Sequence, residues 1–265
     1  MTVGPLERVV HALRPYWAAE AEICRAHLAR PDRSVHVDVG WLARQAAKEL
    51  IDGVVPRIER VRDAATRSVP PAELVRETAE LHEEAAHFAA FADAHDVLAA
   101  SADLPPLGSS DLGAVVAWPA NAALADLRAE HCRDHGRAGE LATSLTEGGC
   151  SALFAVGVEL ETSDDVRDQA IAQACRAVLD DEVEHLRSGL DDLVADLASV
   201  DVDLVIELAV AQSQLRLQMR QLQMGSPVTV ERMDELAAGG AAARDLADVD
   251  ARLARSPVAE SGADS

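Results

Sequence analysis

One spacing of glutamates and histidines occurs twice in this chain of 265 residues. Glu84 and His87 are three residues apart, so they lie on one face of a helix, and Glu49 precedes Glu84 by 35 residues. The same pattern returns 98 residues later in Glu147, Glu182 and His185. In an antiparallel helix pair, about 35 residues bring the chain back to the same level on the neighbouring helix. The repeat therefore predicts two helical hairpins, each with one glutamate opposite a Glu-x-x-His pair.

The composition also favours helices. Hydrophobic residues make up 49% of the chain but aromatic residues only 3%, so the core is built mainly from Ala, Leu and Val. Such side chains suit closely packed helices better than a sheet. No stretch alternates with a period of two for more than a few residues. We therefore expect an all-α fold.

Turn and cap signals divide the chain into predicted helices. These are residues 6–29, 38–55, 71–100, 122–159, 165–198, 202–224 and 230–253. Pro56 either kinks or ends the second helix, and helical character resumes to about residue 66. Residues 101–121 are rich in Pro, Gly and Ser and are expected to form a long connection. Gly136, Gly148 and Gly149 mark irregular points in the helix that follows.

The charge and the cysteines exclude several classes of protein. A net charge of −22 repels phosphate backbones and anionic lipid, so neither a nucleic acid nor a membrane is expected as a partner. The longest uncharged run, residues 112–125, is too short to cross a bilayer, and no secretory signal is visible. Four scattered cysteines predict neither a disulfide framework nor a thiolate zinc site. We expect a cytoplasmic protein.

The repeated glutamates need a proton, a cationic partner or a metal ion if they lie in the hydrophobic core. Leu81, Phe88 and Phe91 form an apolar stripe around Glu84, and a carboxylate there is costly unless it is protonated, paired or bound to metal. Four glutamates carry four negative charges, which two divalent ions would neutralise. Carboxylate and imidazole ligands suit iron or manganese. The repeat therefore predicts a site for two metal ions.

This ligand pattern resembles that of the ferritin-like di-iron carboxylate proteins, which take a Glu from each of two helices and a Glu-x-x-His from each of two others. It is similar in both halves to bacterioferritin, acyl-carrier desaturases, bacterial multicomponent monooxygenases, ribonucleotide reductase small subunits and rubrerythrins. The resemblance implies an antiparallel four-helix bundle over residues 38–198. A helix in residues 1–37 and two in residues 199–254 would pack on it, and residues 255–265 would be a disordered tail.

The resemblance also implies residue roles. The metal ligands would be Glu49, Glu84, His87, Glu147, Glu182 and His185. Glu49 and Glu147 would be terminal ligands, while Glu84 and Glu182 would bridge the ions. By analogy, Asp181 would accept a hydrogen bond from His87, and Glu83 one from His185.

Other residues near the motifs allow two interpretations. Phe91, Gly148 and Cys150 are candidates for a substrate cavity, although Gly148 could equally serve close helix contact. Phe91 stands where a reductase subunit has its radical tyrosine, which argues against that function. Four further residues are expected on solvated surfaces rather than at the metal, namely Glu80, Glu140, His131 and His135.

The resemblance implies a non-haem di-iron oxygenase or oxidase. With O2 it would hydroxylate, desaturate or N-oxygenate a small organic substrate. A ferredoxin or flavin reductase would supply electrons, or peroxide would replace O2, and the assembly could be a homodimer. Four alternatives stay open: a ferritin-like ferroxidase or iron-handling protein, a di-manganese peroxide-detoxifying protein, a tRNA hydroxylase, which the charge disfavours, and a metal-free helical interaction protein.

Overall fold

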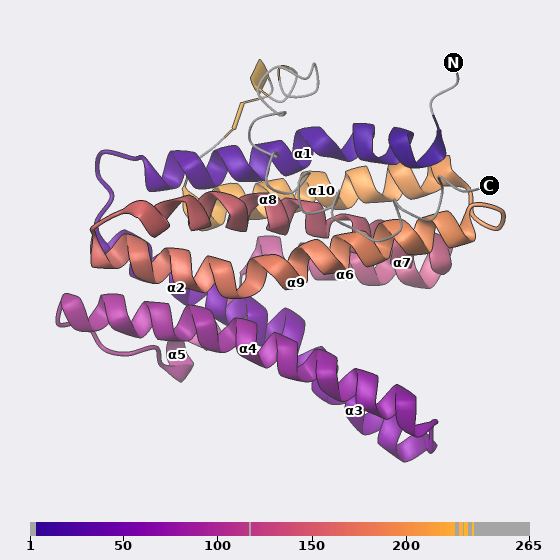
Figure 1. Cartoon of the computed structure of the whole chain (residues 1–265), viewed down its shortest axis with the longest axis horizontal. Coiled ribbons are helices and arrows are strands. Elements are labelled where there is room, and N and C mark those ends of the chain that lie inside the picture. Colours follow the sequence, from indigo (N-terminus) through magenta and orange to yellow (C-terminus); the bar gives the residue numbers. More distant parts are fainter. Residues whose placement is uncertain (1–3, 117, 226–227, 230, 233–234, 236–265) are drawn as a thin grey trace, which may run out of the picture. The chain divides into compact units, whose positions relative to one another are not determined.

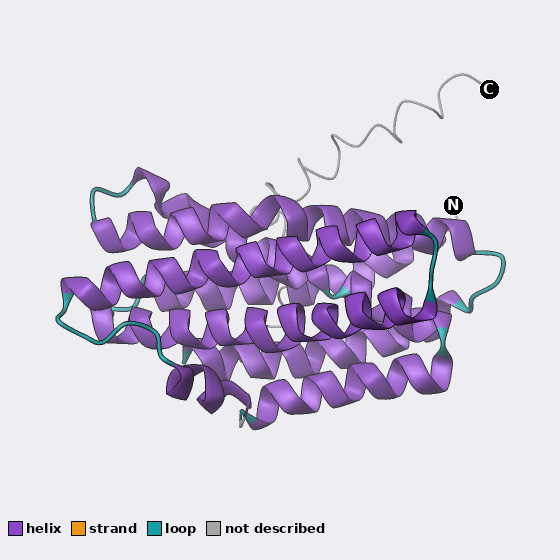
Figure 2. Cartoon of the chain, turned by 90° about the horizontal axis from the view of Figure 1, so that it is seen from below, coloured by secondary structure: helices purple, strands orange, loops and turns teal. Residues whose placement is uncertain are grey.

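The structure is a computed structural model, and all its regular elements are helices (Figure 2). It describes residues 4–116, 118–225, 228–229, 231–232 and 235. Within these ranges no strand occurs. The prediction of an all-α fold with bundle-like helix packing is confirmed. Nearly all of the predicted helix 230–253, and the whole predicted tail, lie outside the described residues.

The helices follow the predicted order. They are α1 (Pro5–Leu28), α2 (Val35–Lys48), α3 (Val55–Arg67), α4 (Pro71–Ser101), α5 (Ser109–Val116), α6 (Pro119–His135), α7 (Arg137–Leu145), α8 (Glu147–Val158), α9 (Val166–Asp196) and α10 (Val202–Met224). A π-helical segment, η1 (Glu49–Val54), joins α2 to α3, and a 3-10 turn, η2 (Glu159–Thr162), follows α8.

Two predicted elements need correction. The connection 101–121 contains the helix α5, which begins where the Asp111 carboxylate accepts a hydrogen bond from the Gly108 N–H at 3.0 Å. The predicted helix 122–159 is three helices. It breaks at Gly136, as expected, where φ is 52°. The second break lies at Thr146 rather than at the two glycines that follow.

Pro56 leaves the chain helical but changes its hydrogen bonding. The Val55 N–H donates to the carbonyl of Leu50, five residues earlier, instead of four. Pro56 has no N–H to continue a regular helix, and the wider π-helical turn comes directly before it. Such turns are frequent at functional sites, and Glu49 is the first residue of this one.

The chain falls into two compact units. Unit 1 comprises Met1–Ala29, Ala123–Gly157 and Leu179–Ser265, as far as these are described, and unit 2 comprises Arg30–Ala122 and Val158–Val178. Helix α9 contributes residues to both. The predicted grouping of a central bundle with additions at both ends stays a prediction.

Each unit has a helical core of its own. In unit 1, α10 packs along α1 (Figure 1) and also contacts α7. In unit 2, α4 packs against α2, η1 and α3. The aromatic centre of unit 2 is the pair of Trp41 and Phe91, whose rings meet edge to face at 6.2 Å. This packing holds η1 against α4, where the candidate ligands lie.

Among the described residues, one apolar stretch passes a simple test for a membrane span. Arg137–Thr162 is long enough and has a mean hydropathy of 1.3 in its most apolar window. In the structure 83% of that window is buried inside the protein, as in a core helix. Length and composition alone are weak evidence, and we infer no membrane partner from them.

A buried ion pair fixes the start of α2 in unit 2. Asp38 is fully buried, and both its carboxylate oxygens lie 3.0 Å from Arg33 Nε. Arg33 Nη1 also lies 2.8 Å from Asp168. Arg33 therefore joins the beginning of α2 to the beginning of α9.

Replacing Asp38 by Ala should lower the free energy of unfolding by about 2–3 kcal/mol, because it removes a buried carboxylate that accepts charged hydrogen bonds from a largely buried guanidinium. Urea denaturation followed by circular dichroism measures this. The control is Asp63→Ala, whose ion pair with Arg67 is about 60% exposed on both sides and is expected to contribute at most about 0.5 kcal/mol. Equal effects of the two substitutions would contradict a structural role for Asp38.

Candidate metal centre

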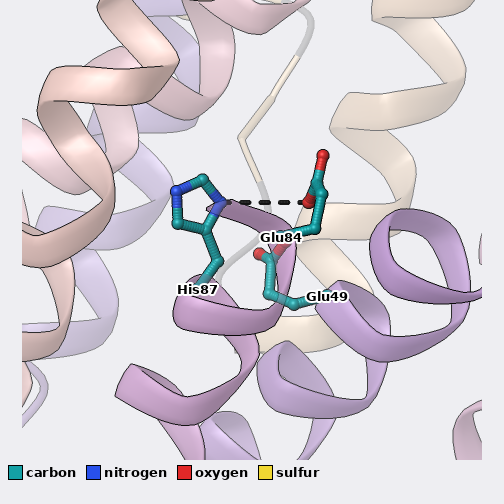
Figure 3. Close-up of side chains that lie close together, drawn as sticks. All are labelled: Glu49, Glu84 and His87. Atoms are coloured by element: carbon teal, nitrogen blue, oxygen red, sulfur yellow. Dashed lines mark ion pairs between the residues drawn. The ribbon is translucent and has the colours of Figure 1, made fainter. Parts of the chain in front are cut away.

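Three predicted ligands come together in unit 2 (Figure 3). Glu49 begins η1, while Glu84 and His87 lie one turn apart on α4. Each offers one ligand atom, and these atoms all lie within 4.8 Å of one another. His87 Nδ1 is 3.9 Å from Glu84 Oε2. The 35-residue spacing therefore does place one glutamate opposite a Glu-x-x-His pair.

These three side chains are shielded from water. Glu49 is 5% exposed and His87 is 2% exposed, while the Glu84 side chain is 18% exposed. Gln45, one turn before Glu49 and itself buried, donates from Nε2 to Glu49 Oε1. Glu49 is thus held in one orientation by a neighbour that carries no charge.

Two carboxylates in this position repel each other. Burial raises the pKa of Glu84, and the Glu49 carboxylate raises it further, while His87, Lys48 and Arg57 act in the opposite direction. A divalent cation would relieve both the repulsion and the loss of hydration. Two oxygens and one imidazole nitrogen are a donor set that suits iron or manganese. The residues of unit 2 therefore fit a metal ion.

Gly53 makes room for this arrangement. A Cβ atom at Gly53 would lie 2.3 Å from Glu84 Oε2, closer than non-bonded atoms approach. Gly53 belongs to η1, so the π-helical turn brings the backbone itself against the Glu84 carboxylate. Sequence reasoning missed Gly53 and Gln45, because neither belongs to the repeated motif.

Gly53→Ala should weaken metal binding at least about tenfold, since the new methyl group displaces a carboxylate from its ligand position. Gly40→Ala is the matched control in α2 of the same unit, because a Cβ there meets nothing within 4 Å. It should leave metal affinity unchanged and raise stability by about 0.5–1 kcal/mol. Equilibrium dialysis against Mn²⁺ measures the affinities. Equal affinities in the two variants would contradict this role of Gly53.

A second cluster lies in unit 1. Glu147 at the start of α8, Cys150 one turn later and Glu182 on α9 bring their ligand atoms within 4.8 Å of one another. His185, the histidine that the repeat predicts, does not belong to this group. It is half-buried on α9, one turn after Glu182. The third ligand-type atom of this cluster is the Cys150 sulfur.

Buried arginines of α10 surround the second cluster. Arg216 contacts Cys150 Sγ through Nη2, and its Nε donates to Glu20 Oε1 at 2.7 Å. Its Nη1 lies 3.9 Å from Glu147 Oε2. Arg220 donates from Nε to Glu20 Oε2 at 3.1 Å. Both arginines and Glu20 are at most 2% exposed.

The two clusters therefore differ in charge and in donor chemistry. Burial raises the pKa of the Cys150 thiol to about 12, although Arg216 lowers it, so the sulfur is protonated at neutral pH. Metals bind thiolate rather than thiol. With a guanidinium already beside Glu147, the unit 1 residues fit a divalent cation less well than those of unit 2.

The other residues predicted for the substrate cavity and for hydrogen bonds to the ligand histidines lie as follows in the structure. Phe91 is fully buried against Trp41. A Cβ at Gly148 would lie 2.3 Å from the Trp17 indole, so the aromatic ring fills the space beside this glycine. Asp181 and Glu83 are half-buried. Their predicted hydrogen bonds to ligand histidines join residues of different units and stay predictions.

His131 is not the surface residue that we expected. It is 8% exposed, and Gln212 Nε2 donates to its Nδ1 at 3.0 Å. His135, one turn later, is exposed. Glu140 is exposed beside Arg137, and Glu80 pairs with Arg57; neither acid belongs to either cluster.

Comparison with models of protein families, with curated proteins and with solved structures returns no match. The resemblance to the di-iron carboxylate proteins therefore stays a prediction from the sequence pattern. Over the residues that it describes, the structure adds an all-α fold with two groups of side chains that could hold a metal ion.

Proposed function

We propose that this chain is a metal-dependent oxidoreductase of the di-iron carboxylate type. The observation that carries the proposal is the cluster of Glu49, Glu84 and His87, whose ligand atoms lie within 4.8 Å of one another in a mostly buried position. Buried carboxylates that face each other without a bound cation are costly. A metal ion is the simplest partner for this donor set.

The chain's own residues prepare the site. Gln45 orients Glu49, Gly53 leaves room for Glu84, and burial of His87 excludes water from the ligand atoms. Iron held there would supply redox chemistry and a place for O2 to react. The protein would contribute ligand geometry and shielding from solvent.

The second part of the proposal comes from the 98-residue repeat in the sequence. It assigns Glu147, Glu182 and His185 to a second metal ion. A small organic substrate, O2 and an external donor such as a ferredoxin or flavin reductase complete the proposed reaction, with peroxide as the alternative oxidant. Manganese in place of iron would suit peroxide chemistry.

The test is anaerobic loading of metal-free protein with Fe²⁺, followed by exposure to O2. We expect the wild type to retain iron and Glu49→Gln to lose most of it. Glu59→Gln, which changes an exposed glutamate on α3, should retain the wild-type amount. If the wild type binds neither iron nor manganese, the proposed function is wrong.

The same experiment separates three functions within this class. Product formed from a supplied reductant and an organic substrate indicates an oxygenase. Growth of a ferric mineral without substrate indicates a ferroxidase. Peroxide consumption by the manganese-loaded protein, without added reductant, indicates peroxide detoxification.

A further inference from the structure

Two arginines of α10 lie one turn apart in the interior of unit 1. Arg216 is 1% exposed and Arg220 is fully buried. Both donate to the carboxylate of Glu20 and both reach Cys150 Sγ, Arg220 at 3.4 Å. Arg216 Nη1 also lies 3.9 Å from Glu147 Oε2. The two side chains therefore share two partners, and Arg216 in addition reaches a candidate metal ligand.

The chain makes room for this network. A Cβ at Gly149 would lie 1.9 Å from Glu20 Oε1, so the backbone of α8 closes directly against the carboxylate that receives both arginines. Any side chain at this position would move Glu20 or α8. The network is thus part of the packing between α1, α8 and α10.

The positive charge beside Glu147 makes the two clusters electrostatically unlike. Arg128 Nη2 lies 3.7 Å from Glu147 Oε1, and Arg216 Nη1 lies 3.9 Å from Glu147 Oε2. Three guanidiniums lie beside Glu20 or Glu147, those of Arg128, Arg216 and Arg220. The negative charge of these two carboxylates is therefore offset without any metal ion.

We propose that Arg216 sets the metal affinity of the second cluster. Its guanidinium places a positive charge beside Glu147, where a metal ion would bind. The guanidinium would repel a divalent ion there and compete with it for the Glu147 carboxylate. The two clusters then load unequally, with tight binding at Glu49, Glu84 and His87 and weak binding at Glu147 and Glu182. This inference presupposes the proposed metal function and adds the order of loading and the residue that controls it.

The experiment titrates metal-free protein with Co²⁺ under equilibrium dialysis. We expect one tight equivalent and a second, weaker one in the wild type. Arg216→Gln should tighten the second equivalent at least about tenfold, because a full positive charge leaves the neighbourhood of Glu147. Glu20 keeps Arg220 as its partner in this variant, so the fold should survive, and circular dichroism verifies this.

Arg137→Gln is the control. It removes a guanidinium from unit 1 that pairs with Glu140, Asp192 and Asp196 rather than with a residue of the second cluster. It should change the second affinity less than about threefold. Arg216→Lys keeps the charge and should preserve weak binding.

Two equally tight equivalents in the wild type, or an unchanged second affinity in Arg216→Gln, would overturn this inference and leave the proposed function standing. Absence of Co²⁺ binding at both clusters would instead defeat the proposed function. If Arg216→Gln does not fold, Glu49→Gln and Glu147→Gln decide the order of loading. The tight equivalent should vanish in the first and persist in the second, and the reverse result would refute unequal loading.

Discussion

Replacing Glu20 by Gln should lower the free energy of unfolding by about 3–5 kcal/mol, because it leaves buried cations without their counter-charge. Glu20 is 2% exposed and receives Arg216 on one oxygen and Arg220 on the other. An amide cannot accept from both guanidiniums through two anionic oxygens. Urea denaturation, monitored through the helical circular dichroism signal, measures the change.

Glu22→Gln is the matched control for this prediction. Glu22 lies on the same helix and pairs with Arg232 at 2.6 Å, but both side chains are about 30% exposed. An ion pair of this kind contributes at most about 1 kcal/mol. Comparable losses in the two variants would show that burial of the Glu20 network does not matter. A double variant, Glu20→Gln with Arg216→Gln, should recover part of the stability, since one uncompensated charge is gone.

The helix boundaries could be read from local signals. Helix α10 has the bounds predicted from the sequence, residues 202–224, because Asp201 caps its first turn and Gly225 ends it with a φ of 65°. Helix α5 was missed because its surroundings are rich in Pro, Gly and Ser, which suggests a loop. The second break in the predicted helix 122–159 fell at Thr146, where no glycine or proline marks it.

The unit 2 ligands were predictable for a different reason. Glu84 and His87 follow from helical periodicity, and Glu49 follows from the length of a helical hairpin. Gly53 was not predictable, because its closeness to Glu84 depends on a π-helical turn and on contact between two helices. No periodic pattern in the sequence predicts the π-helical turn or this contact between helices.

The arginine network of unit 1 escaped sequence reasoning because arginine is usually exposed. A signal was present nevertheless. Gln212, Arg216 and Arg220 follow one another at intervals of four on α10, on a stripe that also carries buried Leu208. Polar side chains in series on the buried face of a helix imply partners elsewhere in the core. The partner of both arginines, Glu20, lies about two hundred residues away in sequence. It can be identified only from the fold.

Removal of metal from unit 2 should have the other large effect. At a free metal concentration one hundred times the dissociation constant, binding adds about 2.7 kcal/mol to the free energy of unfolding. A chelator should remove this stabilisation near neutral pH. Thermal unfolding with and without chelator, with metal loss confirmed by analysis, measures the change.

The metal-free protein should also acquire a particular pH dependence through Glu84. Burial and the Glu49 carboxylate raise the pKa of Glu84 above the ordinary value of 4.5. The native state then binds a proton more readily than the unfolded state, so stability falls as pH rises. The contribution of Glu84 is most favourable below pH 4.5 and is lost as pH passes through the raised pKa.

Bound metal should reverse this dependence, because it holds Glu84 ionised and protons compete with it for the carboxylate. The stabilisation that metal provides should therefore grow with pH across the same window. Glu84→Gln isolates the effect from the other acids of the chain. Without metal, this variant should be more stable than the wild type above the raised pKa, since the amide resembles the protonated acid, and it should respond little to chelator. If the metal-free wild type has the same free energy of unfolding as Glu84→Gln at every pH, the Glu49 and Glu84 carboxylates do not repel each other in the core. The metal centre proposed for unit 2 would then lose its physical basis.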